Sequence, residues 1–271
     1  MPNHAAITPI DLLALIGTPE CPLIIDVTID EDFAEDPHLI PTANRHSHQD
    51  PDGLVAQIRG QPCVVVCQKG LKLSQGMTAW LHSAGERACY LEGGNQGWRT
   101  LPGALRIPSH SLPCRSNGAS LWVAQHRPTL TELASAWLVR RFIDRSARIL
   151  FVAPQAMPGV ADRFGALPLI NPQVRKPPAK RQGPFADMLG DYHLTTPPLL
   201  HIAKLVKGAH TGKSSKTPQS AGIAAIFGGL SCQFRNDTKL MEAGFGVFDA
   251  LYRWTLDSHT NRPPTRQEYD Q

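Results

Sequence analysis

One cysteine in this chain stands where a reactive thiol would be placed. Cys67 follows the apolar run Cys63–Val66 and precedes a short Gly/Lys segment that leads into a helix-like run ending at Leu81. A thiolate or an oxyanion at such a strand-to-helix turn is stabilised by backbone N–H groups and by the helix N-terminus. The alternative is a buried thiol that packs as a small hydrophobe. Because the thiolate is the reactive form of cysteine, we expect Cys67 to be the nucleophile.

The residues after Cys67 suit an anionic ligand. The expected binding loop comprises Gln68, Lys69, Gly70, Leu71, Lys72, Leu73 and Ser74. Lys69 and Lys72 add positive charge, which would attract anions and favour the thiolate. Gly70 lets the loop curl without a Cβ clash, and Ser74 could cap the next helix or donate to a bound oxyanion. The loop also offers several backbone N–H donors.

Strands and helices alternate on both sides of Cys67. Strand-like runs occupy residues 22–27, 63–66 and 87–91, and helix-like runs occupy residues 7–16, 54–59 and 73–83. The acidic stretch from Asp30 to Asp36 is expected to be a loop. This alternation predicts a parallel α/β sheet flanked by helices, and such sheets bind ligands at the carboxyl ends of their strands. Cys67 lies at such an end.

The charge of the chain changes sign near residue 120. Residues 1–120 carry 8 Lys+Arg against 12 Asp+Glu, whereas residues 121–271 carry 19 against 11. Together with the breaker-rich stretch between the halves, this change predicts two domains and gives the second half an affinity for anions. The expected organisation is a first domain at 1–104, a linker at 105–120, a second domain at 121–257 and a flexible tail at 258–271.

The second half follows a different pattern. Strands are expected at residues 122–124 and 148–153, and helices at residues 131–143, 197–207, 219–230 and 237–256. Thr129 and Thr131 are both suitable N-caps for the first of these helices. Residues 172–184 are basic and rich in proline, which predicts a loop. The second domain is therefore expected to be an α-rich α+β domain.

Residues 7–102 resemble a rhodanese-type sulfurtransferase domain. The resemblance lies in four segments in the family's order: Ile25-Asp26-Val27, Ile40-Pro41-Thr42-Ala43, Val65–Gly70, and Leu91–Gly94 with Trp98. It implies a rhodanese-like α/β fold in which Cys67 takes sulfur from a small anionic donor such as thiosulfate and forms a persulfide. A thiol or another sulfur acceptor then removes that sulfur, in two half-reactions. No cofactor is implied.

Three positions depart from the rhodanese pattern. Lys72 and Leu73 stand where many members carry arginine followed by serine or threonine, and the serine comes later, at Ser74. The position of Ala84-Gly85 indicates one extra residue in the loop or its helix, as in phosphatase-like members that hold larger oxyanions. Thr28 stands where an arginine is usual. The identity of the sulfur donor therefore stays open.

The remaining cysteines are scattered, without the spacing of a disulfide framework, which favours a reducing cytoplasm. Cys63 is expected to be structural, and Cys21, Cys89 and Cys114 are the candidates to resolve a persulfide. No apolar run is long enough to span a membrane, and Met1–Ala6 lacks the features of a secretory signal. The protein is therefore expected to be cytoplasmic, with no membrane partner.

Residues 121–257 resemble the C-terminal domain of chromate-resistance (ChrB-type) proteins. The matching segments are Trp122-Val123, Arg127-Pro128, Ala136–Asp144, Phe151-Val152, Leu205–Ala209, Gly229–Ser231, and Phe248–Tyr252 before Trp254. The resemblance implies a link to chromate resistance or chromate-dependent regulation. Relatives carry an Asp-Arg pair, a Cys-Pro pair and an aspartate where this chain has Thr131-Glu132, Ser135-Ala136 and His210. We therefore expect no metal site in this domain.

Three further patterns favour solvated or structural residues over binding sites. His46 and His48 lack a nearby set of partner ligands for a metal, and His210–Ser214 lacks the first glycine of a phosphate-binding loop. A basic face could bind an anion or nucleic acid, although no recognition motif accompanies it. Its residues are Arg140, Arg141, Arg175, Lys176, Lys180, Arg181, Lys204 and Lys207.

The leading hypothesis is a sulfurtransferase that works through a Cys67 persulfide and is associated with resistance to chromate or other oxidants. The alternative is a chromate- or redox-responsive regulator, in which the basic second domain binds DNA or an oxyanion and Cys67 senses the redox state. A third interpretation is an interaction scaffold with an inert first domain.

Overall fold

The structure is a computed structural model of the 271-residue chain. It describes residues 5–115, 118–170, 183–211 and 218–259. The chain divides into two compact units, Met1–Leu112 with Arg141–Arg145, and Pro113–Arg140 with Ser146–Gln271. The first boundary falls within the stretch expected to be a linker.

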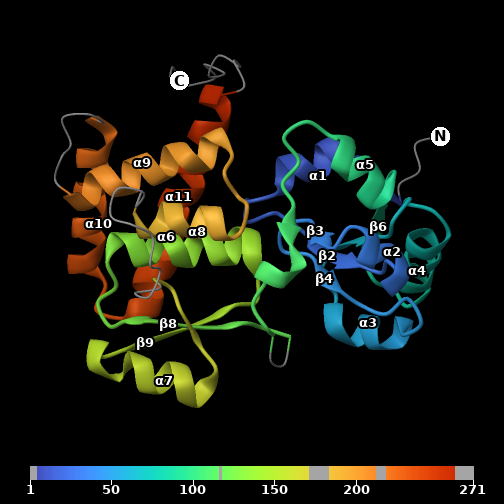
Figure 1. The fold of residues 1–271 in the computed structure, drawn as a ribbon, viewed down its shortest axis with the longest axis horizontal. Helices are drawn as coiled ribbons and strands as arrows, with labels where there is room; N and C mark the ends of the chain where they lie inside the picture. Colours follow the sequence, from blue (N-terminus) through green and yellow to red (C-terminus); the bar gives the residue numbers. More distant parts are fainter. Residues whose placement is uncertain (1–4, 116–117, 171–182, 212–217, 260–271) are drawn as a thin grey trace. The chain divides into compact units, whose positions relative to one another are not determined.

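The first unit is built on a five-stranded sheet of order β1-β6-β5-β2-β4, with every neighbouring pair parallel. A separate antiparallel pair joins β3 to β7. In chain order its elements are β1 (Ala6–Ile7), α1 (Pro9–Leu15), β2 (Leu23–Asp26), α2 (Asp30–Glu35), β3 (His38–Leu39), β4 (Asn44–Arg45), α3 (Pro51–Ile58), β5 (Cys63–Val66), α4 (Lys72–Ser83), β6 (Ala88–Leu91), α5 (Gly94–Thr100), β7 (Ile107–Pro108) and the 3-10 turn η1 (Ser109–Ser111). Figure 1 labels these helices and most of the strands. The predicted parallel α/β sheet flanked by helices is confirmed.

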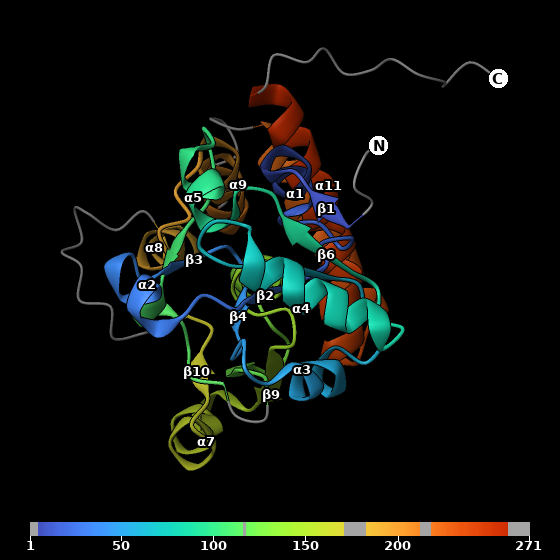
Figure 2. The ribbon, with the colours of Figure 1, turned by 90° about the vertical axis from the view of Figure 1, so that its right-hand side faces the viewer.

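The strand before Cys67 is the central strand of this sheet, and all four of its residues are buried. Residues two apart on a strand share a face, so Cys63, Val65 and Cys67 belong to one hydrophobic cluster. Leu54 of α3 and Leu81 of α4 are among the other members of that cluster. Figure 2 shows α3 and α4 lying together on one side of the sheet. The Cys67 side chain therefore belongs to the face that these helices cover.

Two segments of the first unit differ from expectation. The acidic stretch expected to be a loop forms α2, because the carboxylates of its first turn interact favourably with the positive end of a helix. The start of the expected linker is also ordered: Leu105 and Ile107 are buried, and β7 pairs with β3. Local composition favoured irregular structure in both places, but the charges of its first turn support α2, and burial and strand pairing order the segment around β7.

The second unit is helix-rich around a three-stranded sheet, as predicted. The strand order is β10-β8-β9, and both pairings are parallel. Its elements are β8 (Leu121–Gln125), α6 (Leu130–Leu138), β9 (Arg148–Val152), the 3-10 turn η3 (Pro154–Ala156), α7 (Met157–Phe164), β10 (Leu167–Pro168), α8 (Pro184–Asp191), α9 (Pro197–Thr211), α10 (Pro218–Gln233) and α11 (Asp237–His259). The π-helical turn η2 (Val139–Ile143) follows α6 and includes residues of both units. Within the described ranges, no helix is both long and apolar enough to cross a membrane.

The N-terminus of α6 shows how sequence places a helix start. Of the two candidate caps, Thr129 is the N-cap, and it forms a capping box with Glu132. The helix then buries Trp137, whose ring packs against Phe248 and Tyr252 of α11. These contacts hold α6 against the C-terminal helix.

Candidate active site

Cys67 lies directly after β5, and only 4% of the residue is exposed. Its Sγ is 3.2 Å from the hydroxyl oxygen of Ser74, which is itself fully buried in the first turn of α4. The Ser74 hydroxyl can also donate to the carbonyl of Leu71, at 3.3 Å. When Cys67 is ionised its sulfur can only accept, so Ser74 must then be the donor. The geometry therefore provides one hydroxyl ready to stabilise a thiolate.

Two glycines let the loop after Cys67 pack against the turn that follows β6. Gly70 and Gly94 have φ of +66° and +57°, in the left-handed region. A Cβ at Gly70 would lie 2.5 Å from the carbonyl oxygen of Leu91, and one at Gly94 would lie 2.1 Å from that of Cys67. Only glycine fits at both positions. The shape of the loop thus depends on a turn more than twenty residues away in sequence.

Asn95 ties the strand that carries Cys67 to the neighbouring strand. Its backbone N–H donates to the Cys67 carbonyl at 2.9 Å, and its side-chain amide donates to Asp26 at 2.8 Å and to the Thr28 hydroxyl at 3.2 Å. The Thr28 N–H donates to the other oxygen of the Asp26 carboxylate, at 2.8 Å. This network joins the carboxyl ends of β2 and β5 to the first turn of α5. Sequence reasoning missed Asn95, because its partners come from distant parts of the chain.

The other loop residues differ in where their side chains lie. Lys69, Leu71 and Lys72 are exposed, so the two lysines are available to attract anions from solvent. Leu73 is half-buried and packs against the hydrophobic cluster. Gln68 lines a separate polar pocket. Leu73 and Gln68 were both expected in the binding loop; the side chain of Leu73 contacts the core, and that of Gln68 lines the polar pocket.

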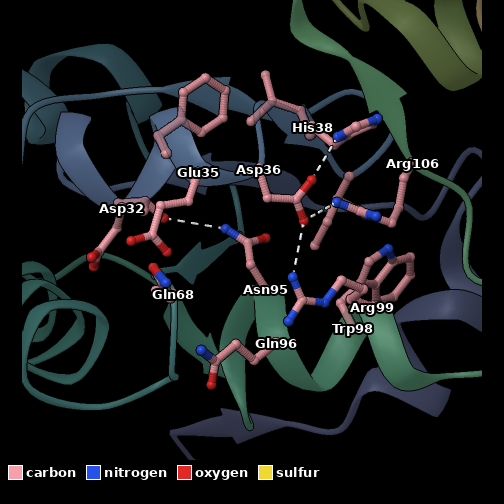
Figure 3. A pocket seen from close by; sticks show the side chains of 14 residues that line it. Asp32, Glu35, Asp36, His38, Gln68, Asn95, Gln96, Trp98, Arg99 and Arg106 are labelled. Carbon is pink, nitrogen blue, oxygen red and sulfur yellow. Dashed lines mark hydrogen bonds and ion pairs between the residues drawn. The ribbon is translucent and has the colours of Figure 1, made fainter.

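The polar pocket next to Gln68 has a volume of about 190 Å³, and Cys67 is not among its lining residues. Figure 3 shows Arg99, Arg106 and His38 converging on the Asp36 carboxylate. Arg106 bonds Asp36 closely, while Arg99 and His38 lie 3.3 Å and 2.7 Å from it. The lining carries three carboxylates, of Asp32, Glu35 and Asp36, against two arginines, so the pocket does not favour an anionic sulfur donor.

The protonation of Asp36 reflects a balance of two effects. Burial opposes ionisation of this carboxyl group, but the hydrogen bonds and positive charges of Arg106 and His38 outweigh it. The net result is a pKa below the ordinary value for aspartate. Asp36 therefore links α2, β3, α5 and the segment before β7 as a carboxylate.

An arginine reaches Thr28 from another strand. The Arg45 guanidinium donates to the Thr28 carbonyl at 2.7 Å and to Asp30 at 2.8 Å, and it lies 4.1 Å from the Phe33 ring centroid. Thr28 itself joins the Asn95 network. Thr28 stands where an arginine was expected, and Arg45 of β4 places its guanidinium next to it. The pairing of β4 with β2 brings Arg45 there.

All six cysteines are free thiols, and three are buried within the first unit's fold. Burial raises the pKa of Cys21 and of Cys89 to about 11 and that of Cys63 to about 12. These thiols stay protonated at neutral pH and are poor nucleophiles. Cys114 and Cys232 are exposed. Cys63, expected to be structural, lies in the same hydrophobic cluster as Cys67.

The remaining sequence candidates are divided between the two units. His46 bonds the backbone carbonyl of Asp50, and the described part of the chain has no group of three or more potential metal ligands. Thr131, Glu132 and His210 line one cavity of the second unit. The basic residues Arg175, Lys176, Lys180 and Arg181 and the residues 212–214 lie outside the described residues.

Two family models match the chain. The model described as the rhodanese-like domain matches residues 8–101, and the model described as the ChrB C-terminal domain matches residues 122–255. The comparison with curated proteins returned no match.

Two solved structures are similar to part of the chain. A rhodanese-like domain protein from Staphylococcus aureus is 27% identical, with 36% of this chain and 94% of that chain covered and a TM-score of 0.32. A protein from Staphylococcus saprophyticus subsp. saprophyticus is 27% identical, with 33% and 87% covered and a TM-score of 0.30.

Proposed function

The chain joins a rhodanese-like domain to a ChrB C-terminal domain, and on that basis we propose that it is a sulfurtransferase whose Cys67 carries the transferred sulfur as a persulfide. The ChrB C-terminal domain links the chain to chromate resistance. The observation that carries the proposal is the contact of 3.2 Å between Cys67 Sγ and the buried Ser74 hydroxyl, at the carboxyl end of the central strand.

The proposed reaction has two half-reactions. In the first, the Cys67 thiolate attacks the outer sulfur of thiosulfate. The S–S bond of the donor breaks, sulfite leaves with the electron pair, and a new S–S bond joins Cys67 to the transferred sulfur. In the second, an acceptor thiolate attacks that outer sulfur, and the electron pair returns to Cys67. The proton of the resting thiol passes to solvent before the first attack.

The residues around Cys67 support each step. The Ser74 hydroxyl would stabilise the thiolate in both half-reactions, since it can donate to the sulfur at the observed separation. Exposed Lys69 and Lys72 would raise the local concentration of an anionic donor. The Asn95 network would hold the Cys67 carbonyl, and with it the strand end, during the exchange.

The direct test is the intact mass of the protein after incubation with thiosulfate. We expect the wild-type protein to gain one sulfur atom and to lose it when cyanide or a thiol is added. The Cys67→Ser variant should gain none, whereas Cys232→Ser, which removes an exposed cysteine, should behave as wild type. A persulfide that survives in Cys67→Ser would contradict the proposal.

Donor identity needs a separate comparison, because the loop departs from the family pattern at Lys72 and Leu73. Single-turnover rates with thiosulfate and mercaptopyruvate, measured by sulfite and pyruvate release, would rank the two donors. Absence of Cys67-dependent turnover with either donor, in protein that is folded, would remove both from the proposal.

A further inference from the structure

The second unit contains a cavity of about 890 Å³ at the carboxyl ends of its parallel strands. From β8 the chain runs through α6 to β9, which lies on one side of β8, and then through α7 to β10 on the other side. Figure 1 shows α6 and α7 on opposite sides of the β8 and β9 strands. Where successive crossovers pass to opposite faces of a parallel sheet, a crevice opens beyond the strand ends. The cavity occupies this crevice, between Gln125 of β8 and Leu167 of β10.

The lining has the mixed character of a small-molecule site. Met157, Pro158 and Ala161 of α7, with Ile170, supply apolar surface. Gln125, Thr131 and His210 add a few polar groups. A volume of a few hundred to about 1,000 Å³, apolar walls and a small number of polar groups are the usual features of pockets for organic ligands.

The charges of the lining disfavour an anion. Glu132 and Asp162 contribute carboxylates, and no lysine or arginine lines the cavity among residues 5–115, 118–170, 183–211 and 218–259. Within the described residues, an oxyanion entering this site would meet two like charges and no lysine or arginine. A neutral or cationic molecule would not be repelled by these two carboxylates.

The N-terminus of α6, which could otherwise attract an anion, is already occupied. Glu132 accepts hydrogen bonds from the N–H of Thr129 at 2.8 Å, from its hydroxyl at 2.9 Å and from the N–H of Gln125 at 3.1 Å. This capping box places a carboxylate of the protein itself at the positive end of the helix. The helix therefore offers little to a bound oxyanion.

We propose that this cavity binds a small, largely apolar organic molecule that is neutral or positively charged, and that it does not bind a tetrahedral oxyanion. The site belongs to the second unit and is independent of Cys67. The apolar walls would hold the body of the ligand, and Gln125, Thr131 and His210 would contact its polar end.

The first test uses two dyes of different charge and a pair of matched variants. Neutral Nile red should bind the wild-type protein saturably, with a fluorescence increase that excess sulfate does not reverse. Ala161→Trp fills the cavity and should weaken this binding at least about tenfold. Ala156→Trp, an exposed change just before α7, should leave it unchanged. Lack of saturable binding, displacement by sulfate, or equal effects of both variants would overturn the proposal.

A second variant covers the case in which Ala161→Trp fails to fold. Asp162 is exposed at the cavity, so Asp162→Lys should fold and replace a negative charge of the lining with a positive one. Binding of the anionic dye 1-anilinonaphthalene-8-sulfonate should strengthen in this variant relative to wild type. The same change at exposed Glu242, away from the cavity, should have no such effect. If both substitutions strengthen binding equally, or neither does, the lining charges do not select the ligand.

Discussion

At the scale of single residues, the environment of Cys67 is defined by a hydroxyl and an amide. Ser74 approaches the sulfur from the first turn of α4, while Asn95 holds the main chain of the same cysteine from α5. The serine acts on the charge of the reacting atom. The asparagine acts on its position, through a buried network with Asp26 and Thr28.

Ser74→Ala should slow persulfide formation by about ten- to a hundredfold, because a hydrogen bond to a charged group is worth about 1.5–3 kcal/mol. Stopped-flow release of sulfite measures this rate. Ser83→Ala, which removes an exposed serine hydroxyl of the same helix, is the control. An unchanged rate in Ser74→Ala would show that the serine does not assist persulfide formation.

Asn95→Ala should lower the free energy of unfolding by about 1–3 kcal/mol, because it leaves the buried Asp26 carboxylate short of a donor. It should also lower kcat, because the strand end loses its link to the neighbouring strand, with little change in the pH dependence of the rate. Urea unfolding and steady-state kinetics separate the two readouts. A loss of stability without any loss of kcat would make Asn95 a purely structural residue.

At the scale of elements, the loop after β5 and the turn after β6 must form together. Each presents a glycine to the other, and the backbone contacts between them leave no space for a Cβ. Strand β5 is favoured locally by its three valines, whereas β6 contains no β-branched residue. Their connection at this edge of the sheet depends instead on two turns that meet only after β5 and β6 have paired.

Gly94→Ala should be far more damaging than Gly85→Ala. Both glycines have positive φ, which costs an alanine about 1–2 kcal/mol. A Cβ at Gly94 would also lie 2.4 Å from the Gly70 nitrogen, whereas nothing lies within 4 Å of one at Gly85. Overpacking should add about 1–3 kcal/mol and displace the Cys67 loop. Thermal unfolding and single-turnover sulfur transfer of both variants provide the comparison, and equal behaviour would contradict the packing argument.

At the scale of the whole molecule, each unit has its own sheet and its own cavity, and each sheet presents the carboxyl ends of parallel strands. In the first unit, the network around Asp36 links four segments from different parts of the fold. Its ion pairs are partly exposed, so salt screens them and their contribution to stability is modest.

Acid should weaken the first unit through Asp36. The pKa of Asp36 in the folded state is lower than the unfolded value of about 3.9. The carboxylate therefore stabilises the fold above the unfolded pKa. This stabilisation is lost as the pH falls through the folded-state pKa. Asp36→Asn should therefore be less stable than wild type at pH 7, with a difference that shrinks below about pH 4. Urea unfolding at several pH values measures this, with the exposed Glu31→Gln change on α2 as control. A difference that stays constant with pH would exclude an ionic role for Asp36.

The sequence by itself determined the fold class of both units, the pairing of a rhodanese-like with a ChrB-type domain, and the strand–loop–helix setting of Cys67. These features rest on short-range patterns: apolar runs, caps, breakers and short motifs whose residues lie within a few positions of one another. The tertiary structure alone decided that Asn95 anchors the Cys67 strand, that Gly94 shapes its loop, that Arg45 reaches Thr28, and that a cavity opens beside β8. Each of these features depends on which strands become neighbours. The residues involved are far apart in the sequence, so no short segment of the sequence specifies their contacts. The identity of Cys67 as the sulfur carrier remains a prediction, and the mass measurement tests it directly.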